Sequence, residues 1–243
     1  MMKFINSVTA KIIIDLYYIQ MKPTLWYIPI VTAASLILLQ FVPGMQENGL
    51  NQMSMIYQSS KIFMLVIGII FCNALLSYYV KNGITRKDYF LGSAIAAAVV
   101  AFSIMIISAI ITGILQLLGV FSNNSPGGIR LEFIENTSST WVIPVIALSL
   151  ILLCYYIAGW TISVGFYRYG NLGGFGFIGI AILFVSIMDL LWEGSLSLPL
   201  LASISIPVPY LTVPLSIIGT LILIFLGLWL IRSVTKQMPI KIQ

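Results

Sequence analysis

The chain has 243 residues, of which 60% are hydrophobic and 8% are charged, and its formal net charge is +5. Ordinary soluble domains carry about 25% charged residues, so this composition excludes a water-soluble globule and favours a protein embedded in a lipid bilayer. Because the chain has no histidine, it also excludes zinc or iron sites built on imidazole and hydrolases of the Ser-His-Asp class.

The N-terminal segment, residues 1–22, is expected to form a helix lying in the inner interface of the membrane. Apolar residues share one stripe of this helix: Ile5, Val8, Ile12, Leu16 and Ile19. Polar residues form another row: Lys3, Ser7, Lys11 and Asp15. Pro23 lacks a backbone donor, so we expect the chain to bend there. The segment is either a simple membrane anchor or an element that transmits motion.

Six apolar, nearly charge-free stretches follow, and each is long enough to cross about 30 Å of hydrocarbon as a helix of about 20 residues. The predicted spans are residues 25–42, 62–80, 94–118, 141–166, 173–192 and 215–232. The expected fold class is therefore an all-α polytopic membrane protein, with residues 23–243 forming one six-span domain.

Lysine and arginine gather on one side of these spans. If the N-terminus lies inside, the inner side holds all of them except Lys61 and Arg130. Cytoplasmic loops retain basic residues, so the pattern predicts that both termini are cytoplasmic and that the protein lies in the cell membrane. The positive net charge is then a sign of topology, and we expect no nucleic-acid partner.

The inner loop between the second and third spans, residues 81–93, is the most charged part of the chain. Asn82-Gly83 is typical of a turn, and Thr85 is placed to cap the next helical turn by accepting a hydrogen bond from the backbone N–H of Asp88. Such a basic turn with an aromatic end can dock on another protein. Retention of positive charge on the inner side would also explain its lysines and arginine.

The outer segment between the fifth and sixth spans, residues 194–214, is apolar but carries four prolines: Pro199, Pro207, Pro209 and Pro214. It is too broken to cross the bilayer and too apolar for a free loop, which predicts short re-entrant or interfacial helices. The segment either closes the outer end of a translocation path or serves as a structural lid.

Polar side chains within the spans are few, and an ionisable group there is a functional-site hypothesis. The candidates for lining a translocation path are Asn73, Gln116 and Asp189. Asp189 lies four residues before Glu193, so a position at the outer interface is the competing interpretation. Small residues at i+4 spacing predict close helix packing: Ser93, Ala97 and Ala101 in the third span, and Gly159 and Ser163 in the fourth.

Residues 82–90 read Asn-Gly-Ile-Thr-Arg-Lys-Asp-Tyr-Phe, which resembles the N-G-[IV]-[ST]-R-[KR]-x-[FY]-[FW] segment of bacterial type-2 ABC transporter permeases. The whole layout is also similar: a basic N-terminal helix, a long third span and a proline-rich outer stretch. Within that family, the short loops and the apolar outer segment resemble the permeases of Gram-positive peptide exporters, of the type that exports phenol-soluble modulins.

The resemblance implies that the loop is a coupling helix seated in a groove of a cytoplasmic ATPase subunit. The residues that would couple to the ATPase are Asn82, Gly83, Thr85, Arg86, Lys87, Asp88, Tyr89 and Phe90. Family members work as two permeases with two ATPases, which implies a second permease copy, in a homodimer or a related heterodimer. The chain has no GxxxxGK[ST] phosphate loop. ATP and Mg²⁺ would therefore belong to the partner, and this chain is expected to be no enzyme and to need no cofactor or metal.

The expected function is the permease subunit of an ATP-driven exporter that moves amphipathic or hydrophobic cargo, such as peptides, out of the cell. One alternative is a self-protection permease that removes antimicrobial peptides from the membrane. Another is a secondary transporter or channel that needs no ATPase. Internal symmetry between spans one to three and four to six would favour that last class, and the sequence offers only similar hydropathy.

Overall fold

The computed structural model describes residues 8–41, 52–118, 142–193, 195–197, 205–207 and 211–236. Five helices lie in these ranges: α1 Val8–Phe41, α2 Gln52–Lys81, α3 Arg86–Leu117, α5 Val142–Glu193 and α6 Val213–Thr235. All five are long and apolar enough to cross a membrane. The predicted helical, multi-pass class of membrane protein is thereby confirmed.

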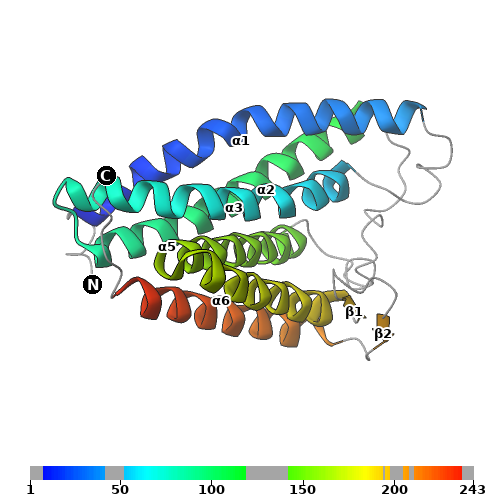
Figure 1. Cartoon of the computed structure of the whole chain (residues 1–243). Helices are drawn as coiled ribbons and strands as arrows, with labels where there is room; N and C mark the ends of the chain where they lie inside the picture. The colour runs from blue at the N-terminus through cyan, green and yellow to red at the C-terminus, as the bar shows by residue number, and fades with distance from the viewer. Residues whose placement is uncertain are drawn as a thin grey trace.

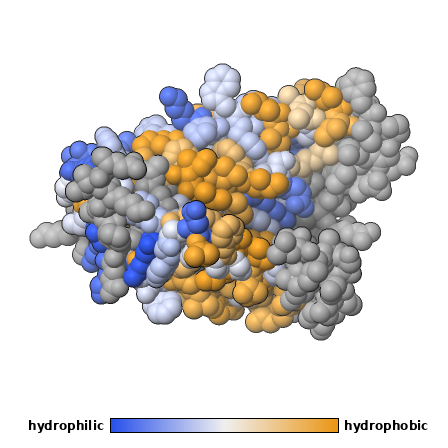
Figure 2. Space-filling view, in the orientation of Figure 1, coloured by the Kyte–Doolittle hydropathy of each residue, from blue (hydrophilic) through white to orange (hydrophobic). Residues whose placement is uncertain are grey.

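The helices lie side by side in one bundle, and the start of α1 and the end of α6 lie at the same end of it (Figure 1). The turn that joins α2 to α3 also lies at that end. We call this the terminal end of the bundle. The surface of the bundle is hydrophilic at the terminal end and largely apolar along the middle, as Figure 2 shows.

Helix α1 runs without interruption through Pro23 and Pro29. Residues 8–22 therefore form one continuous helix with the first predicted span, and the bend at Pro23 stays a prediction. The Thr24 hydroxyl donates to the Gln20 carbonyl at 2.8 Å, the i−4 bond that Ser and Thr side chains make within a helix. The interfacial position of residues 8–22 stays a prediction.

The apolar stripe of the N-terminal segment packs inside the bundle. Ile12 and Leu16 are buried, whereas Lys11 and Asp15 are exposed. A Cβ at Gly92 of α3 would lie 2.7 Å from the Ile12 side chain, so α1 and α3 touch closely here. The stripe is therefore covered by protein, although its member Val8 is exposed.

Helix α5 contains a reversal at Gly170, where φ is +71°. Residues eight apart in a straight helix are separated by about 12 Å, yet a Cβ at Gly174 would lie 2.3 Å from the Phe166 ring. The chain therefore folds back on itself, and α5 consists of two antiparallel halves (Figure 1). The reversal lies between the fourth and fifth predicted spans.

Helices α2 and α5 approach each other at two glycines. A Cβ at Gly68 would lie 2.3 Å from the Tyr156 carbonyl oxygen, and one at Gly159 would lie 2.1 Å from the Leu65 carbonyl oxygen. The Ser163 hydroxyl donates to the Ile69 carbonyl at 2.6 Å. The packing role predicted for small residues is confirmed here and on α3, where the predicted trio is buried: Ser93, Ala97 and Ala101.

The outer segment of residues 194–214 contains two short strands, β1 Ser195–Ser197 and β2 Ser205–Pro207, which pair antiparallel. The short helices predicted for this segment are not found at these positions. Proline disfavours helix by removing a donor, and at the end of a two-stranded ladder it is tolerated. Pro207 occupies such a place, opposite Ser195.

Candidate functional site

The turn between α2 and α3 is closed by two backbone hydrogen bonds that end α2. Ile84 N–H donates to the Tyr79 carbonyl at 3.1 Å, and Gly83 N–H donates to the Val80 carbonyl at 3.1 Å. Gly83 has φ +82°, which glycine adopts without a steric penalty. This pair of bonds is the Schellman arrangement, and it confirms the predicted Asn82-Gly83 turn.

The start of α3 is capped from within the turn. The Asp88 backbone N–H donates to the Thr85 hydroxyl at 3.2 Å, and the Thr85 hydroxyl donates to the Asp88 carboxylate at 2.6 Å. The predicted cap is confirmed. The turn over residues 86–90 is the first turn of α3 itself, so any push on this turn acts directly on a long helix.

Replacing Thr85 by alanine is expected to lower the free energy of unfolding by about 1 kcal/mol, because the Asp88 N–H loses its partner. Thermal unfolding in detergent, followed by the fraction of monodisperse protein left after heating, measures the change. Thr85→Ser keeps the hydroxyl and should unfold at the wild-type temperature. An alanine variant as stable as the serine variant would contradict the capping role.

The predicted coupling residues divide into an exposed set and an anchoring set. The exposed side chains or backbone positions are Asn82, Gly83, Thr85 and Lys87, whereas Arg86, Asp88 and Phe90 are partly buried. Tyr89 is only 2% exposed. Residues 82–87 can thus meet another molecule, and the aromatic pair holds the turn in place.

The two aromatic anchors contact three other helices. The Tyr89 hydroxyl donates to the Phe71 carbonyl at 3.4 Å, and its ring centroid lies 5.6 Å from that of Tyr79 on α2. The Phe90 ring lies 5.4 Å from Trp160 on α5 and 5.5 Å from the Arg232 guanidinium on α6. The first turn of α3 is therefore wedged among α2, α5 and α6.

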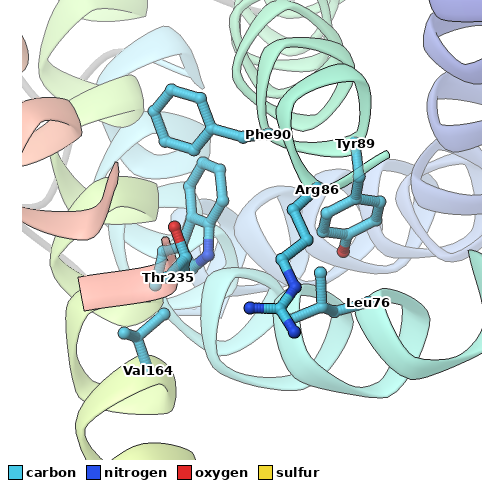
Figure 3. Close-up of a pocket in the computed structure, with 7 residues that line it drawn as sticks. Leu76, Arg86, Tyr89, Phe90, Val164 and Thr235 are labelled. Atoms are coloured by element: carbon cyan, nitrogen blue, oxygen red, sulfur yellow. The ribbon is translucent and has the colours of Figure 1, made fainter. Parts of the chain in front are cut away.

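A small cavity lies beside these anchors (Figure 3). Its lining comes from four helices: Leu76, Arg86, Tyr89, Phe90, Trp160, Val164 and Thr235. The space amounts to about 10 Å³, close to the least that admits one water molecule. It is too small for a cargo or a nucleotide.

Arginine side chains connect this turn to the C-terminal end of α6. Arg86 donates to the Lys236 carbonyl at 3.3 Å, and Arg232 donates to the Arg86 carbonyl at 3.4 Å. Arg168, next to the reversal in α5, donates to the Val234 carbonyl at 2.7 Å. The last carbonyls of a helix lack intrahelical partners and carry partial negative charge, so the guanidiniums of Arg86 and Arg168 satisfy them at the end of α6.

Helix α1 is bonded to the same region. The Thr9 hydroxyl donates to the Asp88 carboxylate at 2.9 Å, and the Tyr79 hydroxyl donates to the Asp15 carboxylate. Asp88 therefore accepts from both Thr9 and Thr85. The described acidic groups at the terminal end are bound by hydroxyls, so cationic groups dominate its surface. Three of these are exposed, Lys81, Lys87 and Lys236, and three are partly buried, Arg86, Arg168 and Arg232.

The predicted path residues are not brought together. Asn73 lies in the half of α2 that leads to Lys81, whereas Gln116 and Asp189 lie close to the opposite ends of α3 and α5. Asp189 is partly buried. The side chains of Asn73 and Gln116 fall outside the described part of the structure, so their role in a path stays a prediction.

Several residues of the site escaped sequence reasoning. Thr9, Trp160 and Lys236 reach the turn from positions far away in the chain. Arg232 offered one signal, since it is the basic residue in the last turn of its helix. Over the residues described, no group of histidine, cysteine or acidic side chains is arranged to hold a metal.

No family model, curated protein or solved structure matches this chain.

Proposed function

We propose that this chain is the permease subunit of an ATP-driven exporter, and that its α2–α3 turn docks on a separate ATPase. The observation that carries the proposal is the turn itself: an exposed cationic tip, Lys81 to Lys87, on a base anchored by Tyr89 and Phe90. A rigid base is needed if force applied at the tip is to reach the helices. Positive side chains complement an acidic groove on a partner.

The hydrogen bonds of the turn support a route for that force. Asp88 is bonded to Thr9 of α1, and Arg86 is bonded to Lys236 after α6. The turn also ends α2 and begins α3. A displacement of the tip would therefore act on four helices at once, which suits a change between inward and outward access of a cavity formed with a second copy.

The proposed topology has six spans, because the two antiparallel halves of α5 each count as one. Both ends of the chain and the α2–α3 turn would then be cytoplasmic. The cationic character of the terminal end supports this orientation, since basic residues are retained on the cytoplasmic side of a cell membrane. The cargo would be amphipathic or hydrophobic, because few charged side chains lie within the spans.

Co-expression with an ATPase encoded beside this chain tests the proposal. We expect the two proteins to purify together, with the ATPase bringing the nucleotide site, Mg²⁺ and the hydrolytic activity. In proteoliposomes, uptake of an amphipathic peptide should require ATP and both proteins. A chain that moves solute alone at the same rate, or that never binds an ATPase, would contradict the proposal.

A further inference from the structure

The exposed face of α1 carries a charged side chain flanked by two aromatic ones. Lys22 is exposed, and Tyr18 and Trp26, one turn before and after it, are 68% and 73% exposed. Residues at i, i+4 and i+8 lie on one face of a helix. Hydrophilic side chains interrupt the apolar surface along the edge where Figure 1 places α1, as Figure 2 shows.

Contacts of the opposite, buried face of α1 fix the level of Lys22 in the bundle. The Gln20 amide donates to the Tyr156 hydroxyl at 3.2 Å, and Tyr156 lies midway along the first half of α5. The Tyr17 hydroxyl lies 3.2 Å from the Ser103 hydroxyl, and Ser103 is near the middle of α3. Lys22 is therefore close to the middle of the bundle, which is deeper than the inner interface predicted for residues 1–22.

A lysine at this level that faced hydrocarbon would be costly. Insertion measurements give about 3 kcal/mol for a lysine at the centre of a membrane helix. Tyr156 lies about 20 Å from either end of its helical half at 1.5 Å per residue, which is several times the length of a lysine side chain. The Lys22 ammonium thus cannot reach water at the ends of the bundle.

No described residue compensates the charge of Lys22 through a hydrogen bond or an ion pair. Asp15, two turns away on the same face, is bonded by Tyr79. Buried or membrane-embedded charges are stable only when they are paired or hydrated. Among the residues that the structure describes, Lys22 therefore lacks the polar surroundings that its charge needs.

We propose that Tyr18, Lys22 and Trp26 line a water-accessible cavity enclosed by a second copy of the chain, and that they bind the anionic group of an amphipathic cargo. The inference rests on the proposed permease function and specifies its cargo class. Lys22 supplies the positive charge for a carboxylate or a phosphate. The rings of Tyr18 and Trp26 supply apolar surface for the hydrocarbon beside that group.

The accessibility of position 22 gives the first test. Lys22→Cys and Ile106→Cys are made in the full chain with Cys72 replaced by serine, since Cys154 is buried. Ile106 is 49% exposed on α3 and is one turn past Ser103, so it is a matched lipid-facing control. A water-soluble maleimide needs a hydrated thiolate. We expect Lys22→Cys to react about tenfold faster, and equal slow rates would overturn the proposal.

Binding of a defined probe gives the second test. The probe is a fluorescent amphipathic peptide with a free carboxyl terminus, and its amidated twin is the neutral comparison. With the full chain in phosphatidylcholine nanodiscs, Lys22→Gln should raise the Kd of the carboxylate peptide about tenfold, because a charge-assisted hydrogen bond is lost. The Kd of the amide should not change. Lys11→Gln, exposed on the same helix near the terminal end, should leave both values unchanged.

Two results of the binding test would overturn the assignment. Lys22→Gln could bind the carboxylate peptide as the wild type does, or it could lose both peptides equally, which would show that charge recognition is not involved. Nanodiscs of phosphatidylglycerol separate the two sources of an anionic group. An unchanged Kd supports a cargo site, whereas displacement of the peptide by this lipid assigns the site to lipid and overturns the cargo assignment.

Failure of this inference is distinguishable from failure of the proposed function. Both tests omit the ATPase and the nucleotide, so they measure only the accessibility of position 22 and its contribution to peptide binding. A chain that binds an ATPase but shows no effect of Lys22 refutes only the site. A chain that shows the Lys22 effect but never binds an ATPase refutes only the coupled mechanism.

Discussion

Replacing Gly159 by alanine is expected to lower the free energy of unfolding by about 3 kcal/mol, at the upper end of what overpacking costs. The added methyl carbon would lie 2.1 Å from the Leu65 carbonyl oxygen. Backbone cannot move aside as a flexible side chain can, so α2 and α5 must separate and lose contacts along their shared face. Thermal unfolding of the purified chain in detergent measures the loss.

Gly113→Ala is the matched control for this change. A Cβ at Gly113 of α3 would meet nothing within 4 Å, and alanine is the better helix former by about 1 kcal/mol. We expect that variant to be as stable as the wild type or more so. If Gly159→Ala and Gly113→Ala unfolded at the same temperature, the close approach of α2 and α5 would be contradicted.

Reversing the charge of Arg86 and Lys87 together is expected to abolish ATP-dependent transport. Arg86→Glu removes the donor to the Lys236 carbonyl and places a carboxylate beside the end of α6, where the partial charge is already negative. Lys87→Glu reverses the most exposed charge of the first turn of α3. The measurement is peptide uptake by proteoliposomes containing the variant and its ATPase, with ATP hydrolysis followed in parallel.

The two single variants separate docking from internal bonding. Lys87 makes none of the hydrogen bonds that link the turn to α6, so Lys87→Glu should weaken ATPase binding while leaving thermal unfolding unchanged. Arg86→Lys keeps the positive charge but loses the planar guanidinium donor. This variant should bind the ATPase, and its ATP-dependent transport should fall less than that of the charge-reversal variant. Wild-type uptake by the double variant would remove the docking role from this turn.

The ends of helices were predictable where an apolar stretch of sequence gives way to a polar turn. The second span was predicted to end at 80 and α2 ends at Lys81; the third was predicted to end at 118 and α3 ends at Leu117. The start of α2 was missed by ten residues, because Lys61 was taken as a boundary. In the structure, α2 continues through Lys61. The Lys61 ammonium lies 4.7 Å from the centroid of the Tyr57 ring, and this cation–π contact stabilises its charge.

The candidate site was predictable only in its local part. The turn at Asn82-Gly83 and the Thr85 cap depend on residues next to each other in sequence, and both are confirmed. The bonds from Thr9 and to Lys236 join positions far apart, and no periodicity in one sequence encodes them. The burial of Tyr89 was missed for the same reason, since it depends on Phe71 and Tyr79, and its docking role stays a prediction.

The bonds between the first turn of α3 and the end of α6 impose an order on biosynthesis. Arg232 and Lys236 lie at the end of α6 and leave the ribosome long after Arg86, yet Arg232 donates to the Arg86 carbonyl and the Lys236 carbonyl accepts from Arg86. Domains assemble as synthesis proceeds, but this end of the bundle must wait for α6. Nascent or prematurely terminated chains would thus present an α2–α3 turn without its bonds to α6. An ATPase that required the fully bonded turn would not bind them.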